Sequence, residues 1–89
     1  MDFSIARGFL RHFRLNELLL ERYALKLRES GVMAQVRAEN ELIFPTAQKR
    51  AAYPVLDELE QVAKKRRVKV RKYAELEEGI EIQVIQLEN

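Results

Sequence analysis

The chain has 89 residues, enough for one domain (1–89), and this length excludes a two-domain enzyme. Hydrophobic residues make up 47% of the chain and charged residues 34%, a balance typical of a folded globular protein and too polar for a membrane span. The absence of cysteine excludes disulfides, thiolate nucleophiles and zinc fingers. We therefore expect one soluble, cytoplasmic domain with neither a membrane span nor a secretory signal.

The inventory of reactive side chains argues against an enzyme. The only serines are Ser4 and Ser30, the only histidine is His12, and no G-x-S-x-G motif positions either serine. A lone imidazole without thiolates leaves only carboxylates as further ligands for a transition metal. The three glycines are too far apart to form a phosphate-binding loop. We expect no catalytic residue, no metal site and no cofactor, and we interpret His12 as a surface or hydrogen-bonded side chain.

Residues 1–15 fit two secondary structures. As a helix, their apolar side chains lie opposite their arginines. As a strand from Phe9 to Leu15, alternate apolar residues share a face that Arg11 interrupts. Gly8 disfavours the helix, and a helix cap at Asn16 needs a non-helical residue at that position. We favour the strand and keep the helix as the alternative.

The clearest predicted helix runs from Asn16 to about Ser30. Asn16 is a preferred N-cap, and Glu17 places a negative charge in the first turn, where the helix dipole favours it. Its apolar face, at helical spacing, comprises Leu20, Tyr23, Ala24 and Leu27. Gly31 then ends the helix as a left-handed residue.

A hairpin is predicted next. Val32–Ala38 alternates between apolar and more polar residues, which is typical of a half-buried strand. Glu39–Glu41 is polar and turn-like, and Leu42–Phe44 is a short apolar run that Pro45 ends. The two runs together predict antiparallel pairing.

The second helix is predicted to begin near Tyr53, with Pro54 at its first position. A proline inside a helix costs about 3 kcal/mol, so residues 47–52 can form only a separate helical turn. Acidic residues near the start and basic residues near the end agree with the helix dipole. One apolar stripe follows the helical period: Val55, Leu56, Leu59, Val62 and Ala63.

The last part of the chain predicts a second hairpin. Val68–Arg71 alternates, Glu77–Gly79 turns the chain, and Ile80–Leu87 returns with the same period. Adjacent apolar residues at Val84 and Ile85 break that period. The break predicts either a bulge or a strand end buried on both faces.

The fold class follows from these elements as α+β. With a strand in residues 9–15, the order is β-α-β-β-α-β plus one C-terminal strand, which resembles the ferredoxin-like sandwich of two helices on one face of an antiparallel sheet. With a helix there, the order is α-β-β-α-β-β. An echo at an offset of 36 residues aligns the two helix-strand units, and we interpret it as repeated architecture. The predicted single core comprises Leu20, Leu27, Val36, Val55, Leu56, Leu59, Val62, Ile82 and Val84.

The strongest local signal is a run of cations without an intervening acid in residues 64–72, here called the basic ridge. Such a ridge, extending from a helix end into a strand, can follow a phosphate backbone and release its counterions. Alternatively, the cations complement the helix dipole and pair with the acids of the second hairpin, which leaves a solvated, internally neutralised face. The basic ridge comprises Lys64, Lys65, Arg66, Arg67, Lys69, Arg71 and Lys72.

Residues 7–13 (RGFLRHF) resemble the basic-glycine-aromatic strand motif of RNA recognition motif domains, from which they depart at residues 10–12 and in lying on the first strand instead of the third. The resemblance implies that bases stack on Phe9 and Phe13, whereas packing beneath a helix is the structural alternative. If the segment is helical, it is amphipathic and suited to an anionic membrane surface. Three arginines here complete the predicted nucleic-acid surface: Arg7, Arg11 and Arg14.

The leading hypothesis is a non-enzymatic module that binds RNA or DNA through backbone charge. If residues 9–15 form the first strand, Arg11 shares a sheet surface with Lys69 and Arg71. The alternative is a protein-interaction or regulatory module that acts as a homodimer without nucleic acid, with Val84–Leu87 as an exposed sheet edge.

Overall fold

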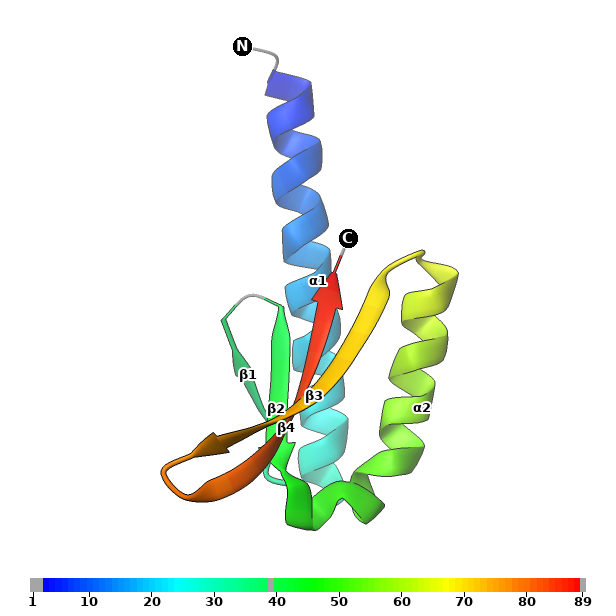
Figure 1. The fold of residues 1–89 in the computed structure, drawn as a ribbon. Coiled ribbons are helices and arrows are strands. Elements are labelled where there is room, and N and C mark those ends of the chain that lie inside the picture. Colours follow the sequence, from blue (N-terminus) through cyan, green and yellow to red (C-terminus); the bar gives the residue numbers. More distant parts are fainter. Residues whose placement is uncertain (1–2, 39, 89) are drawn as a thin grey trace.

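The computed structural model describes the backbone of residues 3–38 and 40–88, and the side chains of these residues from Leu15 onward. Its elements follow the order α-β-β-α-β-β, with a short 3-10 turn, η1, before the second helix (Figure 1). They are α1 (Phe3–Glu29), β1 (Gln35–Arg37), β2 (Glu41–Pro45), η1 (Thr46–Gln48), α2 (Lys49–Lys65), β3 (Lys69–Glu77) and β4 (Ile80–Glu88).

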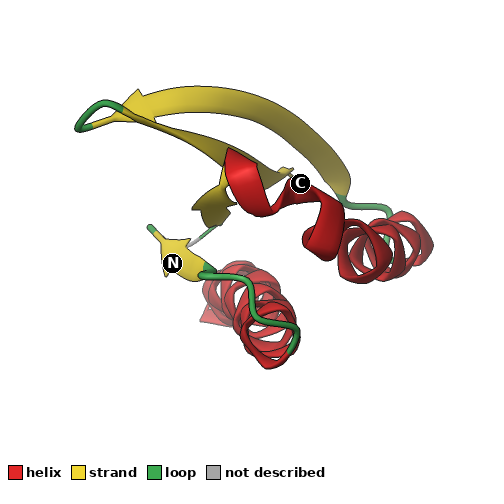
Figure 2. Cartoon of the chain, turned by 90° about the horizontal axis from the view of Figure 1, so that it is seen from below, coloured by secondary structure: helices red, strands yellow, loops and turns green. Residues whose placement is uncertain are grey.

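The four strands form one antiparallel sheet in the order β1-β2-β4-β3, and both helices lie on the same side of it (Figure 2). The molecule measures 47 × 27 × 19 Å, because the first half of α1 projects beyond the sheet (Figure 1). The core between the helices and the sheet joins Leu20 and Leu27 of α1, Leu59 of α2, and Leu42 and Phe44 of β2. The opposite face of the sheet is called the open face below.

The prediction of an α+β fold with two helices and an antiparallel sheet is confirmed, whereas the ferredoxin-like order is not. The preferred strand at residues 9–15 is wrong, because α1 continues through these residues. Adding residues to an existing helix avoids the cost of nucleation, and one interior glycine such as Gly8 costs only about 1 kcal/mol. The alternative order, α-β-β-α-β-β, is the observed one.

The predicted cap at Asn16 is also wrong. Asn16 lies in the middle of α1 and is only 4% exposed. The end of the same helix is as predicted: Gly31 has a φ of 84°, and the amide of Val32 donates to the carbonyl of Leu27 over 2.9 Å. The left-handed glycine therefore closes α1 in a Schellman motif, in which amides after the helix donate to carbonyls of its last turn.

Pro54 lies inside α2 and not at its first position, so that prediction is wrong. Proline at this position removes one intrahelical hydrogen bond, the one from residue 54 to the carbonyl of Arg50. The turn before Pro54 is anchored elsewhere. Ala52 is fully buried, and the Gln48 side chain accepts the amide of Met33 over 2.6 Å. Tertiary contacts thus stabilise the first turn of α2, although a proline within the helix disfavours it.

Both predicted hairpins are present, and the second encloses an unbroken ladder from Lys69↔Glu88 to Glu77↔Ile80. The break in alternation at Val84 and Ile85 therefore marks burial on both faces and not a bulge, since both residues are buried and directly paired. β4 lies between β2 and β3. The prediction that its end forms an exposed edge is wrong, because both of its sides are paired.

The predicted single core is confirmed only in part. Leu20, Leu27, Leu56 and Leu59 are buried together, and the three predicted valines of β1 and α2 are partly buried against them: Val36, Val55 and Val62. Two further predicted residues, Ile82 and Val84, are buried outside this cluster, on the open face. The sheet therefore buries apolar residues on both faces, in two separate layers.

Candidate nucleic-acid interface

The chain connecting α2 to β3 forms a fixed turn that carries two cations of the basic ridge, Arg66 and Arg67, and the other five lie on the adjoining parts of α2 and β3. The amide of Val68 donates to the carbonyl of Ala63 over 2.9 Å, and the amide of Arg67 donates to that of Lys64 over 3.1 Å. Val68 is only 6% exposed and anchors the turn in the core. This is the same closing arrangement that ends α1, so the cations around it are presented by ordered backbone.

Arg67 occupies the left-handed position of this turn, with a φ of 58°. The equivalent position in α1 is Gly31. A residue with a Cβ costs roughly 1–2 kcal/mol in the left-handed helical conformation, whereas glycine adopts it freely. The turn therefore has an arginine at a position where glycine would give the more stable backbone.

The cations of the basic ridge separate into two groups. Lys72 is paired with Glu60 of α2, and Arg71 approaches Glu88 of β4 at 3.8 Å. The others are exposed and form no ion pair with any side chain that the structure describes. These five, here called the basic turn, are Lys64, Lys65, Arg66, Arg67 and Lys69.

Two acids of the second hairpin, Glu75 and Glu77, bind Arg37 and not the basic turn, whereas Glu88 lies opposite Lys69 in the ladder without an ion pair to it. Arg37 of β1 lies 3.0 Å from Glu75 and 3.7 Å from Glu77 of β3, and 3.3 Å from Glu41 of β2. The Tyr73 hydroxyl donates to the same Glu41 oxygen over 2.9 Å. This Arg37 cluster crosses the open face above Val84 and uses the hairpin acids far from the basic turn.

The ionisation of the Arg37 cluster follows from these contacts. Hydrogen bonds to Glu75 and Glu41 raise the pKa of Arg37 above its usual value. Desolvation pushes the pKa of Glu41 upward, but the hydrogen bonds from Arg37 and Tyr73 outweigh it and leave that pKa below normal. The hydrogen bond to Glu41 raises the pKa of Tyr73. The cluster is thus a structural device, and sequence reasoning missed it because its members meet only through the strand order.

The three N-terminal arginines lie on α1, and their side chains fall outside the described residues: Arg7, Arg11 and Arg14. Because this segment is helical, Arg11 does not share a sheet surface with Lys69 and Arg71. The resemblance of residues 7–13 to a strand motif of RNA-binding domains is likewise contradicted, since no strand is formed there. The basic turn is therefore the part of the predicted site that the structure brings together.

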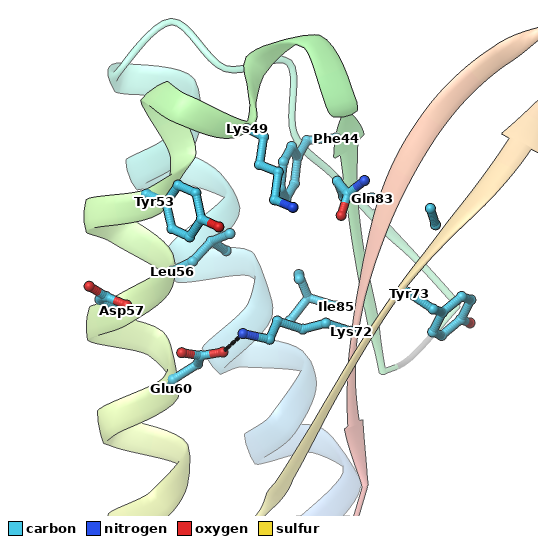
Figure 3. Close-up of a pocket in the computed structure, with 11 residues that line it drawn as sticks. Phe44, Lys49, Tyr53, Leu56, Asp57, Glu60, Lys72, Tyr73, Gln83 and Ile85 are labelled. Atoms are coloured by element: carbon cyan, nitrogen blue, oxygen red, sulfur yellow. Dashed lines mark ion pairs between the residues drawn. The ribbon is translucent and has the colours of Figure 1, made fainter.

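A cavity of about 230 Å³ lies between α2 and the second hairpin (Figure 3). Phe44, Leu56 and Ile85 supply apolar walls, and the ion pair of Lys72 with Glu60 crosses one side. This ion pair raises the pKa of Lys72. Because Lys72 and Glu60 bind each other across it, this cavity is a weaker candidate site than the basic turn.

Within the described residues, no group of three or more His, Cys, Asp or Glu side chains is arranged to hold a metal ion. In the same part of the chain, no helix has the length and apolar character needed to cross a membrane. No protein family, curated protein or solved structure matches this chain. The function of this chain must therefore be inferred from the site itself.

Proposed function

We propose that this chain binds RNA or DNA, with the basic turn contacting the phosphate backbone. The observation that carries the proposal is the group of five adjacent exposed cations without an acidic partner among the described side chains. Cations that are not paired within the fold can replace the counterions of a nucleic acid and release them into solution.

The retention of Arg67 in a left-handed conformation also supports this proposal. Backbone strain of this kind is often found at functional sites, where a side chain is kept for its interaction with a ligand. Lys69 extends the charge onto the open face of β3. No aromatic side chain lies within residues 64–69, so the binding depends on phosphate charge and not on the identity of the bases.

The test measures fluorescence anisotropy of labelled single- and double-stranded oligonucleotides across a salt series. Replacing Arg66 and Arg67 with glutamine removes two phosphate contacts and lowers the slope of log K against log salt by about 1.4–1.8. The matched control replaces Arg22 and Arg50 with glutamine, because both are exposed and lie away from the basic turn. The control variant has the same net charge and keeps the wild-type slope.

Three results contradict the proposal. The first is a wild-type protein without affinity at about 50 mM salt, where phosphate contacts are strong. The second is an equal loss in both variants, which would reflect net charge and not a site. The third is binding to anionic phospholipid vesicles without binding to either oligonucleotide.

A further inference from the structure

We propose that β3 pairs with β3 of a second copy of this chain, in antiparallel register about Tyr73, so that the two sheets become continuous. This inference does not rest on the proposed nucleic-acid function, although Lys69 belongs to both surfaces, and its first test is made without nucleic acid. It starts from the position of β3 as a nine-residue strand at the border of the sheet, paired on one side by β4. In Figure 2, no other element lies along its outer border.

The hairpin turn determines which backbone groups of β3 face outward. Glu78 and Gly79 have φ angles of 52° and 80°, which is typical of a two-residue type I′ turn. The flanking Glu77↔Ile80 pair is then hydrogen-bonded, and alternate pairs back to Lys69↔Glu88 are hydrogen-bonded as well. The intervening residues direct their amides and carbonyls away from β4: Val70, Lys72, Ala74 and Leu76. No hydrogen bond within the described part of the chain occupies these outward groups.

The charges of β3 are complementary to themselves when the strand is reversed. Glu75 and Glu77 each contact Arg37 through one oxygen, Oε2, so the other oxygen of each carboxylate remains for a cation of the partner subunit. In a pairing centred on Tyr73, Lys69 lies opposite Glu77 of the partner subunit, and Arg71 lies opposite Glu75 of the partner subunit. These are non-hydrogen-bonded positions, where opposing Cα atoms are about 4.5 Å apart and side chains contact most closely. The twofold symmetry forms each pair twice, so four ion pairs surround a central contact between the two Tyr73 residues.

The neighbouring registers are less favourable. The outward backbone groups of the two strands can also meet when the twofold axis is shifted by one residue along β3. The axis then passes through Lys72 or Ala74. An axis at Lys72 keeps only one kind of opposite-charge pair, Lys69 with Glu75 of the partner subunit, and it places Lys72 against its own copy. An axis at Ala74 keeps Arg71 opposite Glu77 of the partner subunit but brings Tyr73 against Glu75 of the partner subunit. Charge therefore selects the register about Tyr73.

The same register covers an apolar side chain that is otherwise exposed. Leu76 is 78% exposed, the largest exposed fraction among the exposed hydrophobic residues of the described side chains. It lies opposite Val70 of the partner subunit, at the border of the core. Charged residues usually keep sheet edges apart, but here their order along β3 makes the edge attractive to a second copy.

The first experiment introduces single cysteines into this cysteine-free chain and oxidises the protein without nucleic acid. Tyr73→Cys places two thiols across a non-hydrogen-bonded pair, within the Cα separation that a disulfide accepts. We expect a covalent dimer in high yield. Ala74→Cys is the matched control, since the two cysteines then lie more than about 7 Å apart and stay unlinked. Efficient linking of Ala74→Cys, or none of Tyr73→Cys, overturns the proposal.

The second experiment measures molar mass by light scattering and sedimentation. The wild-type protein should reach twice the 10.5 kDa of one chain as concentration rises, and added salt should weaken that association. Lys69→Glu with Arg71→Glu leaves only acidic charges in the open-face row of β3 and should leave a monomer with an unchanged circular dichroism spectrum. Lys64→Glu with Arg66→Glu changes charge equally outside β3 and should remain dimeric. A monomeric wild type, or a dimer that survives the first pair of substitutions, contradicts the proposal.

Discussion

On the open face of the sheet, Arg37 is held by carboxylates from β2 and β3, whereas at the end of α2 five cations stand without an acidic partner among the described side chains. The first arrangement joins the hairpin of β1 and β2 to β3, which lies beyond α2 in the sequence, so its charges contribute to the fold. The second contributes little to the fold, and Arg67 within it carries a backbone cost. Charge that is paired internally is a stability device, and charge left unpaired is available to a ligand.

The largest expected effect is on the paired side of this comparison. Arg37→Met removes hydrogen bonds to Glu41 and Glu75 and leaves their carboxylates facing each other, so stability should fall by about 1–2 kcal/mol. Urea denaturation measures this loss. Arg50→Met is the control, because Arg50 is exposed without an ion pair to any described side chain and should change stability by less than about 0.5 kcal/mol. Equal losses would remove the distinction between the two regions.

The next effect has opposite signs for stability and binding. Arg67→Gly relieves the left-handed arginine and should raise stability by about 1 kcal/mol. It should also lower the salt slope of nucleic-acid binding by about 0.7–0.9, because one phosphate contact is lost. Gly31→Ala places a Cβ at the equivalent position of α1, where no atom lies within 4 Å of it, so backbone strain alone should destabilise that variant. A less stable Arg67→Gly protein would show that the guanidinium has a structural role.

A smaller effect is expected for the cations at the end of α2. Replacing Lys64, Lys65 and Arg66 together with glutamine removes only exposed charges and a favourable interaction with the helix dipole. Thermal unfolding should shift by no more than about 1 kcal/mol in equivalent stability. A larger loss would mean that the fold uses these charges, and it would weaken their assignment to a ligand.

The smallest effect is a pH dependence confined to the Arg37 cluster. The pKa of Glu41 is lowered in the folded protein, so its contribution is present above the unfolded value near 4.5 and is lost as pH falls through the lower folded value. Glu41→Gln should therefore show less loss of stability than the wild type between about pH 6 and pH 3. Glu21→Gln, an exposed control, should retain the wild-type profile.

Local signals in the sequence were sufficient for several elements. Gly31, the hairpins and the stripe around Leu59 depend on residues close in the chain, and these predictions are confirmed. The predicted helix starts at Asn16 and Pro54 were wrong. A local cap or helix-breaking signal competes with helix propagation and tertiary anchoring, and a single sequence does not reveal which of them prevails.

The candidate site shows the same division. The cations of the basic turn could be found in the sequence as a run. The sequence could not predict which cations of the basic ridge stay unpaired. The Arg37 cluster could not be predicted, because Arg37 and Glu75 are brought together by the order of the sheet. Charge partners separated by 38 residues follow from topology and not from spacing.

The central position of β4 determines when the sheet can form during protein synthesis. β4 is the last strand in the chain, yet it supplies the inner neighbour of both β2 and β3. Until residues 80–88 leave the ribosome, β2 and β3 lack the strand that lies between them in the sheet. Leu42 and Phe44 of β2 also lack their neighbours on β4. The helices depend on local hydrogen bonds and can form earlier. The nascent chain should therefore acquire helical structure first and complete its sheet in one late step after residue 88 has emerged.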